Sequence, residues 1–126
     1  MNNGNLTNSE WYVLDCLWER SPQTVMELVA ALRERLGWAK STTITTLRRM
    51  EDKGLVLCAV EGRTKHYTPV VRRDNAVRGE TRSFLDKVYR GSVGLMMSAL
   101  AEDQALSKAE IDELYEILRK AEEGEL

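Results

Sequence analysis

The 126-residue chain contains only two cysteines and a single histidine. Cys16 and Cys58 lie far apart and form no Cys-x-x-Cys pair, so the usual ligands of a zinc centre are missing. We therefore expect no metal and no cofactor, and two buried, unreactive thiols. With one histidine and no glycine-rich loop that could hold phosphate, the sequence also argues against an enzyme.

Long hydrophobic runs are absent as well. No apolar stretch approaches the roughly 18 residues that span a bilayer, and the polar start, residues 1–10, has no signal-peptide core. We therefore expect a cytoplasmic protein. The length suits one domain, or one small domain with an extension.

The net charge of the whole chain is small, but the charged residues are unevenly distributed along it. The net charge is −2, yet residues 38–73 contain 8 Lys/Arg against 3 Asp/Glu, whereas residues 74–126 contain 7 against 12. A local basic excess of this kind is typical of a nucleic-acid-binding segment, and the acidic remainder hides it in the total.

Three helices are predicted in the first half. Thr7 and Glu10 have capping-box spacing ahead of a first helix of about three turns, and Thr24 and Glu27 repeat it before a second helix that ends at Gly37. A third, threonine-rich helix runs from Ser41 to Lys53 and stops at Gly54. Its expected inward positions are the following: Thr43, Thr46, Leu47 and Met50.

Two β-rich segments follow the third helix. Residues 55–60 and 64–70 flank Glu61-Gly62-Arg63, which predicts a two-stranded hairpin. Three helices with tight turns and a hairpin make a winged helix-turn-helix, assigned to residues 5–72. The expected fold class is mainly α with a small β-wing, in which this DNA-binding domain is followed by a helical dimerisation region, residues 74–122.

The third helix and the hairpin carry the candidate DNA contacts. Short hydroxyl side chains allow close approach to a phosphate backbone and can bond to phosphates or base edges, which explains why mediocre helix formers are tolerated there. We expect Ser41, Thr42 and Thr45 near base edges or the first phosphates, and Ile44 against a thymine methyl. The expected contacts to the DNA backbone are basic: Lys40, Arg48, Arg49, Arg63 and Lys65.

The second half is helical and unusually apolar. Residues 93–100 are apolar nearly all round, and Ser107 and Glu110 open a last helix with one apolar side. Such helices cannot cover themselves well, and a second copy is the simplest cover; a two-fold dimer would also match a palindromic DNA site. The expected dimer contacts are apolar or aromatic: Val88, Tyr89, Leu95, Met96, Leu100, Ile111, Leu114 and Leu118.

Several motifs together resemble the penicillinase repressor family. They are Glu10-Trp11-x-Val13-Leu14-x-x-Leu17-Trp18, Lys53-Gly54-Leu55, residues 84–91 and the start of the last helix, and the similarity covers about residues 6–120. The resemblance implies a homodimeric winged-helix repressor of β-lactam resistance genes or related genes that binds dyad operators. It also implies inactivation by a membrane sensor-protease pathway that cleaves within the dimerisation region, here at Ala99-Leu100.

The chain departs from that family pattern at two places. Ile44 stands where members often have a basic residue, and Ala99-Leu100 stands where the methicillin-resistance repressor has Asn-Phe. The copper-responsive branch has a cysteine-rich tail, whereas the last residues here are AEEGEL, so we expect no copper sensing by that route.

Two other functions are compatible with the predicted fold. One is a thiol-responsive regulator that uses Cys16 or Cys58, and the other is a winged-helix protein-interaction module that does not bind DNA.

Overall fold

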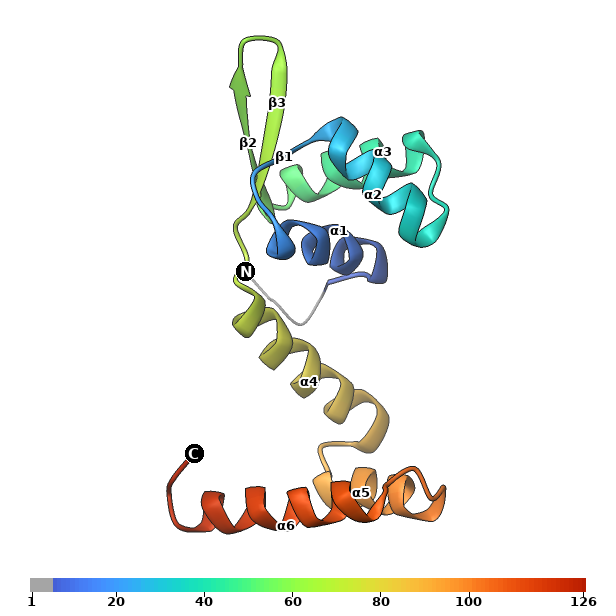
Figure 1. The fold of residues 1–126 in the computed structure, drawn as a ribbon, viewed down its shortest axis with the longest axis vertical. Coiled ribbons are helices and arrows are strands. Elements are labelled where there is room, and N and C mark those ends of the chain that lie inside the picture. Colours follow the sequence, from blue (N-terminus) through green and yellow to red (C-terminus); the bar gives the residue numbers. More distant parts are fainter. Residues whose placement is uncertain (1–5) are drawn as a thin grey trace. The chain divides into compact units, whose positions relative to one another are not determined.

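The structure is a computed structural model that describes residues 6–126, and it divides into two compact units at Ser83/Phe84 (Figure 1). The elements of the first unit are α1 (Asn8–Glu19), β1 (Gln23–Thr24), α2 (Val25–Leu36), α3 (Lys40–Asp52), β2 (Val56–Glu61) and β3 (Thr64–Pro69). Helix α4 (Arg73–Tyr89) begins in the first unit and ends in the second, where α5 (Val93–Glu102) and α6 (Lys108–Glu122) follow.

The helix boundaries follow from local capping chemistry. The side chains of Thr7 and Thr24 each accept a hydrogen bond from the backbone N–H three residues on. The Glu10 and Glu27 carboxylates in turn accept from the backbone N–H of Thr7 and Thr24, so both expected capping boxes are present. Gly37 ends α2 in the left-handed conformation, with φ of 70°, which a glycine adopts without steric cost.

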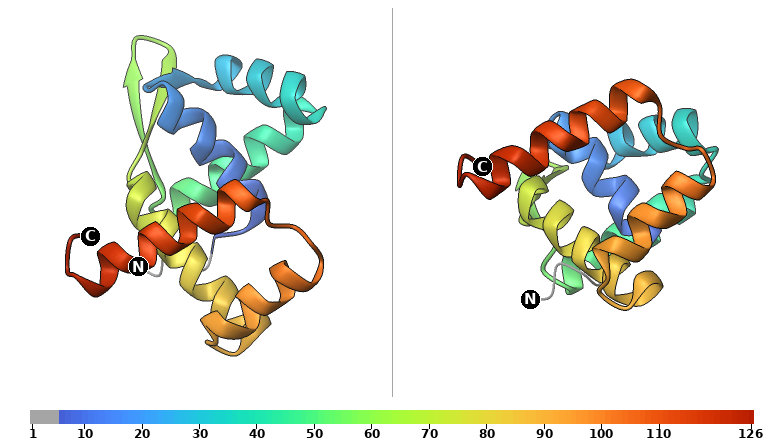
Figure 2. Two further views of the ribbon diagram at one scale, coloured as in Figure 1. Left: turned by 60° about the horizontal axis from the view of Figure 1, so that its bottom comes forward. Right: turned by 90° about the horizontal axis from the view of Figure 1, so that it is seen from below.

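The core of the first unit lies between α1, α2, α3 and the sheet. Its fully buried members are aliphatic residues of the three helices, among them Leu14, Leu28 and Leu47, joined by Val56 and Tyr67 from the hairpin. Figure 2 shows the three helices turned against one another beside the hairpin, as the predicted helix-turn-helix requires. The predicted fold class is therefore confirmed for this unit.

The sheet has three strands in the order β1-β3-β2, all antiparallel, where the sequence predicted only the hairpin. Strand β1 is two residues long and pairs Gln23 with Tyr67 and Thr24 with His66. The hairpin turn is Gly62-Arg63, with a positive φ at Gly62 alone, as a type II′ turn requires at its first central position.

A hydrogen bond ties the segment that follows the hairpin to the core. The indole Nε1–H of Trp18 donates to the carbonyl oxygen of Val71 at 2.9 Å, while the Trp18 ring meets Trp11 edge to face at 5.3 Å. Trp11 and Trp18 are therefore packing residues of the first unit.

The second unit has almost no core of its own. Among residues 84–126 only Leu85 is buried, and neither α5 nor α6 has a buried residue. Helices α5 and α6 diverge from their connecting loop (Figure 2), and a groove of about 560 Å³ lies between them. In the part of the chain that the structure covers, no helix is both long and apolar enough to cross a bilayer.

Candidate DNA-binding surface

Helix α3 divides into a buried and an exposed side. Thr43, Thr46, Leu47 and Met50 are its buried residues, as the sequence predicted. Because the helix turns about 100° per residue, the positions between them point outward. The outward positions hold short polar and basic side chains, with Ile44 partly exposed: Ser41, Thr42, Ile44, Thr45, Arg48 and Arg49.

The start of α3 differs from the starts of α1 and α2. Its N-cap is Ala39, which offers no side-chain acceptor, so the N-cap side chain bonds to none of the first backbone N–H groups of α3. Lys40 and Ser41, both exposed, occupy the first two helical positions. The partial positive charge of a helix start favours anions, and Lys40 adds a full charge beside it.

Five exposed cations lie on α3 and the hairpin. Of the residues in 6–126, none forms an ion pair with any of the following: Lys40, Arg48, Arg49, Arg63 and Lys65.

Two other cations of the same unit are paired with carboxylates. The guanidinium of Arg20 lies 3.2 Å from the Glu27 carboxylate, and that of Arg35 lies 2.6 Å from the Glu19 carboxylate. The cations of α3 and the hairpin, where the sequence predicted phosphate contacts, differ from these two because they form no ion pair with any of residues 6–126.

A hollow of about 530 Å³ lies between the hairpin tip and the start of α2. Arg63, Thr64 and Lys65 line one side, and Thr24, Val25 and Met26 line the other. The two exposed cations that line this hollow can contact an anionic group such as a backbone phosphate. Sequence reasoning named Arg63 and Lys65 but missed the contribution of α2, because nothing local brings residues 24–26 near the hairpin.

A buried ion pair connects the far end of α3 to α1. Glu10 is 1% exposed, and one of its carboxylate oxygens accepts a hydrogen bond from Lys53 Nζ at 2.6 Å, while the other accepts from the Thr7 backbone N–H at 2.9 Å. Burial alone would raise the pKa of Glu10, but the Lys53 and Thr7 contacts outweigh it and lower that pKa. Capping-box spacing predicted the role of Glu10 at α1; its bond to Lys53 was missed.

The two cysteines differ in environment. Cys16 is buried, as expected, and burial raises the pKa of its thiol against the opposing charge of Arg35. Cys58 is partly exposed, so the expectation that both thiols are buried is wrong for Cys58. The reason is its place on β2, an edge strand of the sheet, opposite Tyr67.

Trp38 stands directly before α3 and packs against the core. Its ring meets Tyr12 of α1 edge to face at 6.5 Å between centroids. Within residues 6–126, no group of three or more His, Cys, Asp or Glu residues is arranged to hold a metal ion.

A compact three-helix unit, an exposed polar helix whose cations form no ion pair with residues 6–126, and a basic β-hairpin define a winged helix-turn-helix protein. The chain matches the penicillinase repressor family model over residues 6–120. It therefore belongs to the penicillinase repressor family, whose members are transcriptional repressors and not enzymes.

Individual relatives agree with this assignment. The chain is 30% identical over 115 residues to the penicillinase repressor of Bacillus licheniformis, covering 91% of this chain and 90% of that protein. It is 24% identical to the methicillin resistance regulatory protein MecI of Staphylococcus aureus, covering 91% and 94%. The solution structure of the DNA-binding domain of the repressor BlaI superposes with a TM-score of 0.53 at 26% identity, covering 57% of this chain and 88% of that one.

Proposed function

We propose that this protein is a homodimeric transcriptional repressor that binds dyad operators of β-lactam resistance genes or related genes. Helix α3 enters the major groove, and the β2-β3 hairpin contacts the phosphate backbone beside it. The observation that carries this proposal is the set of exposed cations on α3 and the hairpin that lack ion-pair partners in residues 6–126. Cations left without internal partners are available to replace the counterions of DNA phosphates.

Base reading is assigned to the first turns of α3. Ser41, Thr42 and Thr45 are exposed and short, so the helix axis can come close to the base edges. Ile44 is partly exposed between them and offers an apolar contact for a thymine methyl. Arg48 and Arg49 lie further along the helix, where phosphates flank the groove.

Dimerisation is assigned to the second unit. Leu95, Tyr115 and Leu118 are 57%, 70% and 64% exposed, and the α5-α6 groove has an almost wholly apolar lining. An exposed apolar surface of this extent is unfavourable in water and marks an interaction site. None of the expected dimer contacts is buried within one protomer, so each is available to a second copy: Val88, Tyr89, Leu95, Met96, Leu100, Ile111, Leu114 and Leu118.

Release from DNA is assigned to cleavage at Ala99-Leu100 by a membrane sensor-protease pathway. Both residues lie in α5 and are partly exposed. Proteases bind extended chain, so the cut requires local opening of α5, and a helix without a buried residue opens at low cost.

The test of DNA binding is the salt dependence of affinity for duplex DNA. With several Lys and Arg residues of each protomer on phosphates, the slope of log K against log salt should be steeper than about −4 for a dimer. Arg48→Ala should reduce the magnitude of that slope by roughly 0.9 for each protomer. Arg35→Ala removes a cation that is already paired with Glu19 and should leave the slope unchanged.

A flat salt dependence on every duplex, or equal effects of the two arginine variants, would contradict the proposal. In that case the winged-helix protein-interaction module becomes the better description.

A further inference from the structure

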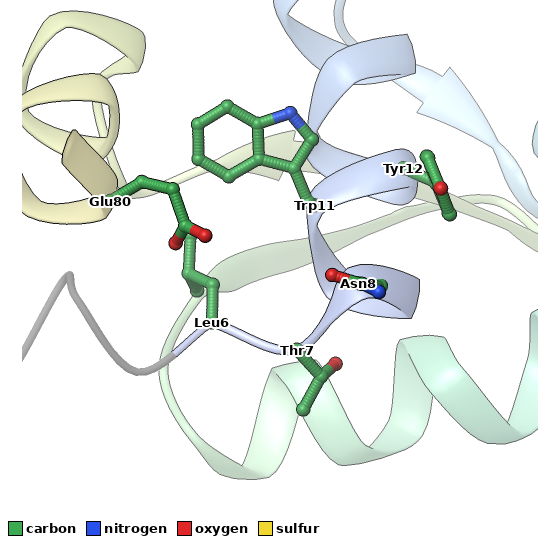
Figure 3. Close-up of a pocket in the computed structure, with 6 residues that line it drawn as sticks. All are labelled: Leu6, Thr7, Asn8, Trp11, Tyr12 and Glu80. Carbon is green, nitrogen blue, oxygen red and sulfur yellow. The ribbon is translucent and has the colours of Figure 1, made fainter. Parts of the chain in front are cut away.

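The first unit contains a small hollow that DNA binding and dimerisation do not use. It has a volume of about 210 Å³ and is lined by Leu6, Thr7, Asn8, Trp11, Tyr12 and Glu80. In Figure 3 the Glu80 side chain extends from α4 toward Leu6 and the Trp11 indole, while Asn8 and Tyr12 project from α1. Pockets for drug-sized ligands measure about 300–1,000 Å³, so any occupant of this one is small.

The lining selects for positive charge. Two aromatic rings and a carboxylate surround the hollow, and no residue of this lining is cationic. In the described part of the chain, the Glu80 carboxylate makes no hydrogen bond and no ion pair that would satisfy it internally. An aromatic face attracts a cation through its quadrupole, and a nearby carboxylate adds direct attraction. The apolar and aromatic part of the lining, Leu6, Trp11 and Tyr12, favours an alkylated ammonium over a strongly hydrated metal ion.

The indole at this site is held in place by packing. Trp11 is partly buried and meets Trp18 edge to face at 5.3 Å, and Trp18 is in turn bonded to the Val71 carbonyl. A ligand that contacts Trp11 therefore meets a preorganised wall, which lowers the entropic cost of binding.

Lining residues are connected through one intermediate residue to the segments that flank both ends of helix α3. Tyr12 packs edge to face on Trp38, which precedes the α3 N-cap Ala39. At the other end, the Thr7 backbone N–H donates to Glu10, and the Glu10 carboxylate binds Lys53, the C-cap of α3. A change at the hollow can therefore alter how firmly α3 is held at each end.

We propose that the hollow between α1 and α4 is an effector site for a small organic ammonium compound, and that its occupancy changes the affinity of α3 for DNA. Binding of the cation itself does not depend on the function proposed above; only its effect on DNA does.

The probe for this site is choline, titrated at constant ionic strength while the indole N–H resonances of the full-length protein are followed by NMR. The Trp11 resonance should shift and saturate. Glu80→Gln should weaken choline binding by about two- to fivefold, the range expected for one exposed charge contact. Glu34→Gln, which alters an exposed carboxylate of α2 outside this lining, should leave binding unchanged.

Charge selectivity is tested with 3,3-dimethylbutan-1-ol, the uncharged isostere of choline. It should bind much more weakly than choline. Equal binding of the two compounds, an unchanged affinity in Glu80→Gln, or no saturable shift of Trp11 would each overturn the site.

The coupling is tested by measuring DNA affinity with choline chloride replacing sodium chloride at equal concentration. Choline should change DNA affinity by a factor equal to that by which DNA changes choline affinity, because linkage is reciprocal. The Glu80→Gln variant should need a correspondingly higher choline concentration for the same change in DNA affinity. If saturating choline leaves DNA affinity unchanged, the coupling is refuted. If the protein binds no DNA at all, the function proposed above fails, and the NMR titration still tests whether choline binds at the hollow.

Discussion

At the scale of single residues, two threonines of α3 have opposite hydrogen-bonding states. The hydroxyl of Thr43 is fully buried and has no hydrogen-bond partner in the described chain. The hydroxyl of Thr46, one turn later, donates to the Thr42 carbonyl oxygen at 2.7 Å. A buried hydroxyl without a partner loses its hydration and gains nothing in return, so Thr43 weakens the unit.

Thr43→Val should therefore stabilise the protein by about 1 kcal/mol, because it removes an unsatisfied hydroxyl at nearly constant volume. Thr46→Val is the matched control and should be neutral or destabilising, since it deletes a bond that is made. Urea unfolding followed by circular dichroism gives both free energies of unfolding. If Thr43→Val destabilises as much as Thr46→Val, the Thr43 hydroxyl has a partner in solution.

The specificity of α3 for operator bases also depends on single residues. Thr45→Ala should change the ranking of operator variants, by about 1–3 kcal/mol where a base contact is lost, because Thr45 is exposed in the first turns of α3. Arg49→Ala should instead weaken binding to all duplexes by the same factor, as expected for a phosphate contact. Affinities for a panel of single-base operator variants measure both. A uniform loss with Thr45→Ala would remove Thr45 from the base-reading set.

At the scale of elements, α1 and α3 are joined end to end by the Glu10–Lys53 ion pair. The two residues are separated by 43 positions, and the carboxylate also caps α1. The Lys53 side chain is 44% exposed, so only the carboxylate depends on this contact for its solvation. The pair therefore stabilises the position of α3 mainly in the ionised state of Glu10.

The lowered pKa of Glu10 makes its contribution to stability dependent on pH. That contribution is fully present above the ordinary glutamate pKa of about 4.3 and is lost as the pH falls through the lower folded value. Glu10→Gln should cost about 1–3 kcal/mol at pH 7 and progressively less toward pH 3. Urea unfolding across that range measures the difference from wild type, with Glu34→Gln as an exposed control. A difference that does not shrink with acid would contradict the ion-pair account.

At the scale of the whole molecule, the two units differ in how they are stabilised. The first unit has a contiguous core of helix and hairpin residues, whereas the second has a single buried residue, Leu85. The proposed dimer places DNA reading in the self-sufficient unit and association in the dependent one. Dimeric binding raises the effective concentration at the second half-site to about the mM range, so it can increase avidity by factors of 10²–10⁴.

A single cut between Ala99 and Leu100 should therefore release the protein from its operator while leaving the reading unit folded. Cleavage separates the whole of α6, with its proposed dimer contacts Ile111, Leu114 and Leu118, from the first unit. We would insert a specific protease site there, then measure mass by sedimentation and operator affinity before and after cutting. Affinity should fall by about 10²–10⁴ as the dimer dissociates.

The uncut protein with the same insertion is the control for the insertion itself. Circular dichroism should show that the first unit keeps its fold after cleavage. A cut protein that stays dimeric and still binds its operator would refute release by proteolysis and leave a small-molecule inducer as the better explanation.

Local chemistry in the sequence was enough to locate the helices and the hairpin. The Thr7, Thr24 and Ser107 caps each bond to a residue three positions away, and the Gly62 turn joins neighbouring strands. The interacting residues are therefore close together in the sequence. The buried face of α3 was predictable for the same reason, since helical periodicity alone separates Thr43 from Thr45. The residues proposed to contact DNA were named from that periodicity and from charge, and their roles remain predictions.

Contacts between distant residues were decided only by the tertiary structure. Strand β1 exists because Gln23 meets Tyr67, and two residues have no strand signal of their own. The partner of Glu10, the missing partner of the Thr43 hydroxyl and the partial exposure of Cys58 likewise depend on which surfaces are brought together. Periodicity and capping act over one helical turn or one strand pair, whereas burial and long-range pairing depend on the packing of the whole unit.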